Sequence, residues 1–207
     1  MTETLVKTEP IEVILFDLGG VLIELGGIPT MLSWTRLSEQ EVWHTWLQSP
    51  AVRKFESGQS SGADFAEELV SELALNVSAE EFLAHFVQWP KSVLPGGLEL
   101  LDQLRADYKV ACLSNSNHLH WQRFEQETPL LSLFHAVLSS HQTGLLKPDP
   151  EAFEHTINVL EALPQAILFL DDNLVNVEAA RKAGLRAEVT QGIGQARQHL
   201  QDYGLIK

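Results

Sequence analysis

The chain has 207 residues, 44% of them hydrophobic, and carries 14 basic against 28 acidic side chains, a formal net charge of -14 at pH 7. That length allows one hydrophobic core with room for a small second lobe. The excess negative charge repels nucleic acids and anionic membrane surfaces, so we expect neither as a partner. A protein of this charge that binds a phosphate needs local positive charge or a metal ion.

The start of the chain and its cysteine content are typical of a soluble cytoplasmic protein, which we expect here. No run of roughly 18 apolar residues occurs, and residues 1–10 lack the basic and apolar regions of a signal peptide. We expect these first residues to be a frayed lead-in. The single cysteine, Cys112, lies in an apolar run, which predicts a buried structural thiol and excludes an internal disulfide.

The first predicted element is a strand in residues 11–20, a β-branched and aromatic run that closes on Asp17 and two glycines. A carboxylate at the carboxyl end of a parallel strand lies where open α/β sheets place their chemistry, and glycines let the backbone approach a ligand closely. Taken alone, the stretch fits equally well an aspartate that only turns the chain after a strand.

Between residues 26 and 93 the pattern changes to helical spacing without a convincing strand. Ser38-Glu-Gln-Glu41 and Ser78-Ala-Glu-Glu81 have the Ser-x-x-Glu form of a capping box, and residues 61–75 place Phe65, Leu69 and Leu73 on one face. We therefore expect an inserted small α-helical cap domain at 26–93.

Residues 1–25 and 94–207 are expected to form the core domain around this insert. The glycines of Gly26-Gly27 and Pro95-Gly-Gly97 are candidate hinges between the two. Four tryptophans fall in the insert, and we interpret them as the core of a small helical bundle: Trp34, Trp43, Trp46 and Trp89.

After the insert, predicted strands and helices alternate. The strands are expected at about 108–113, 135–139, 166–170 and 186–190, and the helices at 98–106, 118–126, 150–160, before Gly184 and at 194–203. Alternation of this kind predicts an α/β fold, a doubly wound parallel sheet with helices on both faces and right-handed crossovers.

Polar clusters follow four of the predicted strands: Asp17, Ser114 with Asn115, Lys147, and Asp171 with Asp172. Each cluster alone has an ordinary explanation as a helix start, a solvated loop cation or an N-cap. Because the carboxyl ends of parallel strands meet at one edge of a sheet, residues far apart in sequence can converge there. The four clusters in this order therefore predict one site.

The same clusters carry a resemblance to a known family. Phe16-Asp-Leu-Gly-Gly-Val-Leu22, Leu113-Ser-Asn-Ser-Asn117, Leu146-Lys-Pro-Asp-Pro150 and Phe169-Leu-Asp-Asp-Asn173 resemble the motifs of the haloacid dehalogenase (HAD) superfamily of phosphatases, in spacing over nearly the whole chain. Within it, the chain is similar to bacterial sugar-phosphate phosphatases of the α-D-glucose-1-phosphate phosphatase type. The resemblance implies a HAD-like Rossmannoid core with a helical cap between the first and second motifs.

Phosphoryl transfer requires that the charge of the phosphoryl group be neutralised before an anionic nucleophile can attack. The resemblance implies Asp17 as the nucleophile that forms an aspartyl-phosphate, with Mg²⁺ as cofactor. Mg²⁺ prefers a few oxygen ligands and keeps several waters, so we expect it at Asp17, at Asp172 and, by resemblance, at the Gly19 carbonyl. Asp171 is expected to support this site or to be an alternate ligand.

Donors to the phosphate are expected from the second and third motifs. Ser114 and Asn115 are expected to bind phosphoryl oxygens together with backbone N–H groups at the start of the next helix. Lys147 is expected to add a compact positive charge and to hold Asp17 ionised.

The sequence departs from the superfamily pattern at Gly19, where most of its phosphatases carry a second Asp that acts as general acid and base. Glycine cannot transfer a proton, and this help is typically worth about 10²- to 10⁴-fold. Two hypotheses remain open. The substrate has a good leaving group, such as the anomeric oxygen of a sugar 1-phosphate, or another side chain stands in: Glu24, Glu56, His118 or His120.

The predicted function is thus a magnesium-dependent phosphatase acting on a small phosphorylated metabolite, with a sugar phosphate expected. Alternatives are a C-halide dehalogenase that uses the same Asp17 without a metal, and a non-catalytic binding or regulatory protein. A phosphomutase is a weaker alternative, since it needs a proton shuttle. The polar residues of the insert that are candidates for setting specificity cannot be ranked from the sequence: Arg36, His44, Arg53, Lys54 and Glu56. The sequence does not indicate the oligomeric state.

Overall fold

The structure of the protein is a computed structural model that describes residues 9–207. The predicted lead-in therefore lies, for residues 1–8, outside the described residues. The strands are β1 (Val13–Phe16), β2 (Ile23–Leu25), β3 (Pro90–Val93), β4 (Lys109–Ser114), β5 (Ala136–Ser139), β6 (Ile167–Asp171) and β7 (Arg186–Val189). The helices are α1 (Ile28–Trp34), α2 (Glu39–Gln48), α3 (Pro50–Glu56), α4 (Gly62–Glu72), α5 (Ala79–Phe86), α6 (Gly97–Leu104), α7 (His118–Glu127), α8 (Ser140–Thr143), α9 (Pro150–Leu160), α10 (Leu174–Lys182) and α11 (Gly192–Asp202), with 3₁₀ turns at Leu130–Leu133 and Pro164–Ala166.

Five parallel strands form the main sheet in the order β5-β4-β1-β6-β7, so β1 lies at its centre. Phe16 is in register with Cys112 of β4 and with Leu170 of β6, which places the carboxyl ends of the three strands side by side. The predicted strands and the helices between them are all present, and the doubly wound α/β fold is confirmed.

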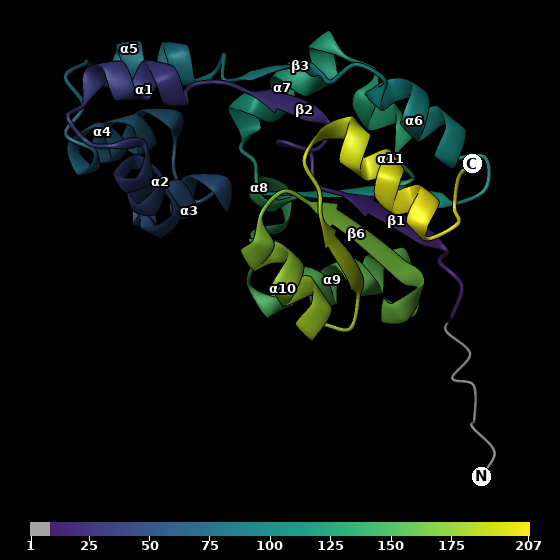
Figure 1. Cartoon of the computed structure of the whole chain (residues 1–207). Coiled ribbons are helices and arrows are strands. Elements are labelled where there is room, and N and C mark those ends of the chain that lie inside the picture. Colours follow the sequence, from purple (N-terminus) through teal and green to yellow (C-terminus); the bar gives the residue numbers. More distant parts are fainter. Residues whose placement is uncertain (1–8) are drawn as a thin grey trace.

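Strand β1 is wholly buried because helices cover both faces of the sheet. Ile14 and Phe16 pack into a cluster with α6 and α11, whereas Val13 and Leu15 pack into a second cluster with α9 and α10. Figure 1 shows α6 and α11 on one side of the sheet and α9 and α10 on the other. A strand covered in this way is apolar throughout instead of alternating, which explains the continuous apolar run in the sequence.

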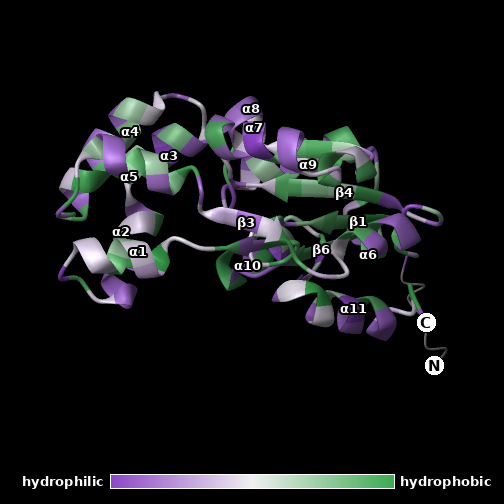
Figure 2. Ribbon diagram, turned by 90° about the horizontal axis from the view of Figure 1, so that it is seen from above, coloured by the Kyte–Doolittle hydropathy of each residue, from purple (hydrophilic) through white to green (hydrophobic). Residues whose placement is uncertain are grey.

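Helices α1–α5 gather at one end of the molecule, beyond β3 (Figure 2). They enclose a hydrophobic cluster of their own, in which the rings of Phe55 and Phe65 stack with centroids 4.3 Å apart. The capping box predicted at Ser38 is complete, with bonds in both directions to Glu41. At Ser78 the side chain accepts from the Glu81 backbone N–H, as half of such a box.

The two ends of the insert are joined by an antiparallel pair of short strands, β2 and β3. The expectation of no strand between residues 26 and 93 was wrong here, because β3 is four residues long and reads Pro-Lys-Ser-Val, without a strand-like apolar pattern. Gly27 has φ of 101°, and a Cβ there would lie 2.2 Å from the Trp89 ring. Gly96 is the N-cap of α6, on the far side of β3 from the insert. The paired strands β2 and β3 therefore form the connection to the insert.

Among residues 9–207, none of the helices combines the length and the apolar character needed to cross a bilayer.

Cys112 is buried in β4, as predicted, and burial raises the pKa of its thiol to about 12. The thiol is therefore neutral and packs as a small apolar group.

Candidate active site

Asp17 lies directly after β1, at the carboxyl edge of the sheet. Its backbone N–H donates to the Leu170 carbonyl at 2.8 Å, which continues the pairing with β6 and fixes the backbone of Asp17. Asp17 as a whole is 8% exposed, and its carboxylate contacts Lys147. The prediction that the first strand delivers this carboxylate to the sheet edge is confirmed.

Lys147 connects Asp17 with Asp171. Its Nζ donates to Asp17 Oδ1 at 2.8 Å and to Asp171 Oδ2 at 2.6 Å, and its side chain is 2% exposed. Burial by itself would lower the pKa of Lys147, but the two carboxylates raise it above its usual range. The ammonium is therefore charged. Its contact with Asp17 joins two residues that lie 130 positions apart in the sequence.

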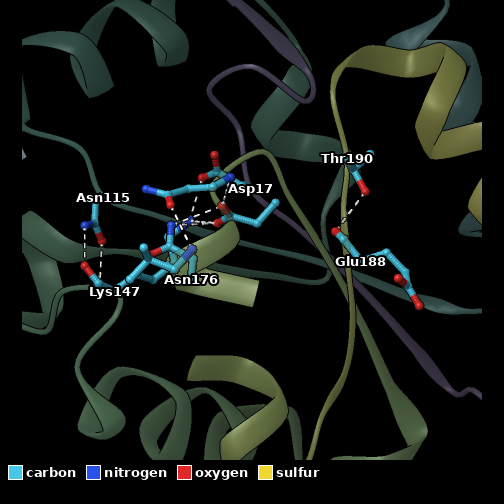
Figure 3. A network of polar contacts seen from close by, with 9 residues as sticks. Asp17, Asn115, Lys147, Asn176, Glu188 and Thr190 are labelled. Atoms are coloured by element: carbon cyan, nitrogen blue, oxygen red, sulfur yellow. Dashed lines mark hydrogen bonds and ion pairs between the residues drawn. The ribbon is translucent and has the colours of Figure 1, made fainter. Parts of the chain in front are cut away.

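Asp171 accepts more hydrogen bonds than Asp17 or Asp172. Besides Lys147, it accepts hydrogen bonds from the Asn173 backbone N–H at 2.8 Å and from Asn176 Nδ2 at 3.1 Å to both oxygens. Figure 3 shows Asn176 and Lys147 converging beside Asp17. Asp171 therefore positions Lys147, and of our two expectations for it the supporting role agrees better with these contacts.

Asn115 holds the backbone of Lys147 by two hydrogen bonds (Figure 3). Its Nδ2 donates to the Lys147 carbonyl at 2.8 Å, and its Oδ1 accepts from the Lys147 N–H at 2.9 Å. One N–H of Nδ2 is not used by these contacts, so the expectation that the Asn115 side chain donates to phosphate stays a prediction. The second and third N–H groups of α7 are engaged, since Asn117 Oδ1 accepts from Leu119 and His120.

Three carboxylates lie close enough to share a cation. Asp17, Asp171 and Asp172 each offer an oxygen within 4.8 Å of the other two. Burial raises the pKa of Asp17 to about 7, against the lowering effect of Lys147, and burial followed by Asp171 raises the pKa of Asp172 to about 6. One ammonium does not neutralise three carboxylates, and a divalent ion with oxygen ligands matches this donor set.

Gly20 explains why the aspartate is followed by glycines. Its φ is 70°, and a Cβ at this position would lie 2.2 Å from Asp172 Oδ2. A side chain here would therefore displace the Asp172 carboxylate from the cluster. At Gly19 a Cβ would meet only the end of the Leu25 side chain, at 2.9 Å.

A cavity of about 570 Å³ opens between the sheet edge and the insert. Of the predicted site residues, it is lined by Asp17, Gly19, Ser114, Asn115, Lys147 and Asp172. The opposite wall is largely apolar and includes Ile28, Trp43, Trp46, Leu47, Phe86 and Trp89. The interpretation of the tryptophans as bundle core is therefore incomplete, because three of the four line this cavity, and Trp43 is 40% exposed.

Of the polar candidates in the insert, only Glu56 lines the cavity. Arg53 forms an ion pair with Asp149, and Lys54 pairs with Glu68 at 3.3 Å. Arg36 and His44 are exposed and lie outside the cavity lining.

Sequence reasoning missed Asn176 and the apolar wall. Asn176 lies five residues after Asp171, in the first turn of α10. Its hydrogen bond to Asp171 therefore depends on where that helix begins, which the N-cap residue Asn173 could have indicated. The wall had no such signal, because the insert's apolar residues serve its own core at the same helical spacing.

Comparisons with known proteins agree with this geometry. A family model described as haloacid dehalogenase-like hydrolase matches residues 11–184. A phosphatase of Mycobacterium tuberculosis is 30% identical over 200 residues, covering 87% of this chain and 91% of that protein. D-ribitol-5-phosphate phosphatase of Bacteroides thetaiotaomicron is 25% identical over 196 residues, covering 90% and 95%.

Among solved structures, a HAD family enzyme of Bacteroides thetaiotaomicron in complex with magnesium and inorganic phosphate is similar to this chain. The TM-score is 0.73 at 26% identity, over 92% of this chain and 98% of that one. That enzyme was crystallised with the cation and the anion that the three carboxylates and Lys147 would suit.

Proposed function

This chain belongs to the haloacid dehalogenase-like hydrolases, and on that premise we propose that it is a magnesium-dependent phosphatase acting on a small phosphorylated metabolite through an aspartyl-phosphate on Asp17. The observation that carries the proposal is the convergence of three carboxylates and one buried ammonium at a cavity, which Asp17, Asp172 and Lys147 line. A site of this charge binds an anion only together with a cation, and a phosphate ester with Mg²⁺ meets that requirement.

Asp17, Asp172 and the Gly19 carbonyl would hold the magnesium ion. The ion supplies positive charge that offsets the phosphoryl oxygens. Asp171 would stay with Lys147, Asn173 and Asn176, to which its oxygens are already bonded.

In the first step an Asp17 carboxylate oxygen attacks phosphorus, and the bond to the leaving oxygen breaks. Lys147 Nζ, 2.8 Å from Asp17 Oδ1, lowers the Asp17 pKa against the rise that burial causes, and so favours the ionised carboxylate that attacks. The Ser114 hydroxyl and the Asn115 backbone N–H would donate to phosphoryl oxygens, which the position of both residues in the cavity lining supports. Water then attacks the aspartyl-phosphate and releases inorganic phosphate.

A C-halide dehalogenase is the less favoured alternative. Its displacement needs no metal, so two further carboxylates beside the nucleophile would only raise the energy of the attacking anion. A non-catalytic protein is also less favoured, because the buried ion pairs of Lys147 with Asp17 and Asp171 are costly to form and make sense around a reacting group.

We propose the division into a core domain, residues 1–25 and 94–207, and a cap domain, residues 26–93. The separate hydrophobic cluster of α1–α5 and the two-strand connection β2–β3 support it. The cap would decide which ester enters, since it supplies the wall opposite Asp17.

A sugar or polyol phosphate is the substrate class that we favour. The similarity to D-ribitol-5-phosphate phosphatase supports it, and indole rings such as those of Trp43 and Trp46 can pack against the C–H face of a sugar. The apolar wall favours a second candidate, a phosphate ester with an apolar leaving group.

The test is a phosphatase assay with sugar phosphates, polyol phosphates and aryl or prenyl phosphates, with magnesium and with chelator. We expect turnover only with magnesium, and Asp17→Asn to lower kcat by about 10³-fold or more. Asp102→Asn, an exposed aspartate of α6, is the matched control. Activity that survives the chelator, or halide release from a 2-haloacid, would contradict the phosphatase.

A further inference from the structure

The reaction proposed above needs a proton at two points. The leaving oxygen takes one when its bond to phosphorus breaks, and the attacking water loses one in the second step. Gly19, two residues after the nucleophile, has no side chain to supply or accept it. Four side chains were named from the sequence as substitutes, and the structure separates them.

His120 lines the cavity, but both of its ring nitrogens are engaged. Nε2 bonds to the Phe86 carbonyl at 2.8 Å and Nδ1 to Asn117 Nδ2 at 3.0 Å. These partners fix a neutral ring that donates through Nε2 and accepts through Nδ1. Burial lowers the pKa of His120 to about 4, so the ring joins α7 to α5 and does not transfer protons to the cavity.

His118 and Glu24 are exposed and do not line the cavity. The His118 ring lies against Phe55, with centroids 5.3 Å apart. Glu24 lies in β2, on the connection to the insert. Neither side chain is placed to meet a substrate bound at Asp17.

Glu56 is the last residue of α3 and lines the same cavity as Asp17, Gly19 and Lys147. Within residues 9–207, its carboxyl makes no hydrogen bond or ion pair. Lys147 Nζ directs two of its three N–H groups to Asp17 and Asp171, at 2.8 and 2.6 Å, and its contacts among these residues do not include Glu56. A carboxyl without a partner in a cavity wall is available to a substrate or a water molecule.

The backbone that carries Glu56 is anchored on both sides. Phe55 stacks on Phe65 inside the insert, with centroids 4.3 Å apart. Gly58, with φ of 73°, lies so close to the core that a Cβ would be 2.5 Å from the His141 carbonyl oxygen. Glu56 is therefore held over the site by a segment that contacts α8 directly, as a proton-transferring group requires.

The surroundings of Glu56 suit a carboxyl that changes its protonation state. Burial raises its pKa to about 7, with Lys147 lowering it and Asp17 raising it. A group with such a pKa is present in both forms near neutral pH, which general acid-base catalysis favours.

We propose that Glu56 is the catalytic acid and base that replaces the aspartate missing at Gly19, an inference that rests on the proposed phosphatase function. In the first step the protonated Glu56 carboxyl gives its proton to the leaving oxygen as Asp17 bonds to phosphorus. In the second step the Glu56 carboxylate takes a proton from water as the water oxygen bonds to phosphorus and the Asp17–phosphorus bond breaks. Glu56 is then protonated again, and Asp17 is a free carboxylate.

The experiment compares Glu56→Gln with the wild type on two ester classes in the presence of magnesium. For alkyl phosphates, whose leaving oxygen needs a proton, we expect kcat/KM to fall by about 10²- to 10⁴-fold. For p-nitrophenyl phosphate, whose leaving group needs none, kcat/KM should change little, whereas kcat falls and a burst of p-nitrophenolate appears because the aspartyl-phosphate persists. Glu24→Gln is the matched control, and it should behave as wild type.

Equal losses on both ester classes without a burst would overturn the proposal, because a structural role predicts that pattern. Unchanged activity of Glu56→Gln would overturn it as well. If Glu56→Gln does not fold, Glu56→Asp serves, and partial recovery of alkyl phosphate turnover is expected from its remaining carboxyl. Failure of the wild type itself to hydrolyse either class would instead contradict the proposed function.

Discussion

At the scale of single residues, Glu56 is a carboxyl that the fold holds at a cost. In the unfolded chain its carboxyl is hydrated. In the folded protein it lies in a cavity wall near Lys147 and Asp17 without a hydrogen bond to either. Such a residue lowers the stability of the folded protein when it is ionised, and side chains of this kind are concentrated at functional sites.

The pH dependence of stability follows from its pKa. Glu56 has a pKa of about 7 in the folded protein against an ordinary value of 4.5, so between these values the unfolded chain has already lost the proton that the folded protein keeps. Its contribution to the free energy of unfolding therefore falls as pH rises through that window. We expect Glu56→Gln to be more stable than wild type by about 1–3 kcal/mol near pH 8, and similar to it near pH 4.5.

Urea unfolding at both pH values, in chelator so that metal does not contribute, measures this difference. Glu24→Gln again serves as control, since Glu24 is exposed in β2. An equal stability difference between wild type and Glu56→Gln at the two pH values would show that Glu56 is not held in an unfavourable environment.

At the scale of elements, helix α7 of the core holds the end of the insert. Arg123 Nη1 donates to the Val87 carbonyl at 2.7 Å and to the Pro90 carbonyl at 3.0 Å, and the guanidinium also pairs with Glu127. Val87 is the C-cap of α5, where a positive charge interacts favourably with the helix end. Two carbonyls of the segment that leads into β3 thus depend on one core side chain.

Replacing Arg123 by Met removes both hydrogen bonds while keeping most of the apolar stem. We expect a loss of about 1–3 kcal/mol in the free energy of unfolding, because the carbonyls are left without this charged donor. Amide hydrogen exchange should increase in residues 79–93 more than in β1 or β4. Arg105→Met, an exposed arginine after α6, is the control, and exchange that rises equally in both variants would contradict the contact.

At the scale of the whole molecule, the charge of -14 opposes the approach of an anionic substrate. The positive charge needed for binding is confined to the site, where Lys147 is buried and the proposed magnesium ion would add to it. The field outside the cavity is therefore repulsive, and salt screens it over a distance of roughly 10 Å at moderate ionic strength.

We accordingly expect kcat/KM for a dianionic phosphate ester to rise as KCl is added at saturating magnesium, by roughly 2- to 10-fold from low to moderate ionic strength. Initial rates at substrate concentrations well below KM measure it. Replacing KCl by choline chloride should give the same increase, since screening does not depend on the cation. A steady fall with salt would mean that local positive charge dominates the approach of substrate.

The sequence by itself determined the strands, the sheet and the placement of Asp17, Lys147, Asp171 and Asp172. These features depend on patterns that are local in the chain: an apolar run wherever both faces of a strand are buried, and a polar cluster wherever such a strand ends. Parallel pairing then brings the clusters together, as the register of Phe16 with Leu170 shows.

Only the tertiary structure decided which groups of the insert meet the site. Glu56, Trp43 and Trp46 lie on helices whose spacing satisfies the insert's own core, and nothing in that spacing indicates which remaining face turns toward Asp17. Their placement depends on how α3 contacts α8 and how β2 pairs with β3, contacts between residues far apart in sequence. The same holds for His120, whose two hydrogen bonds removed it from the candidates for proton transfer.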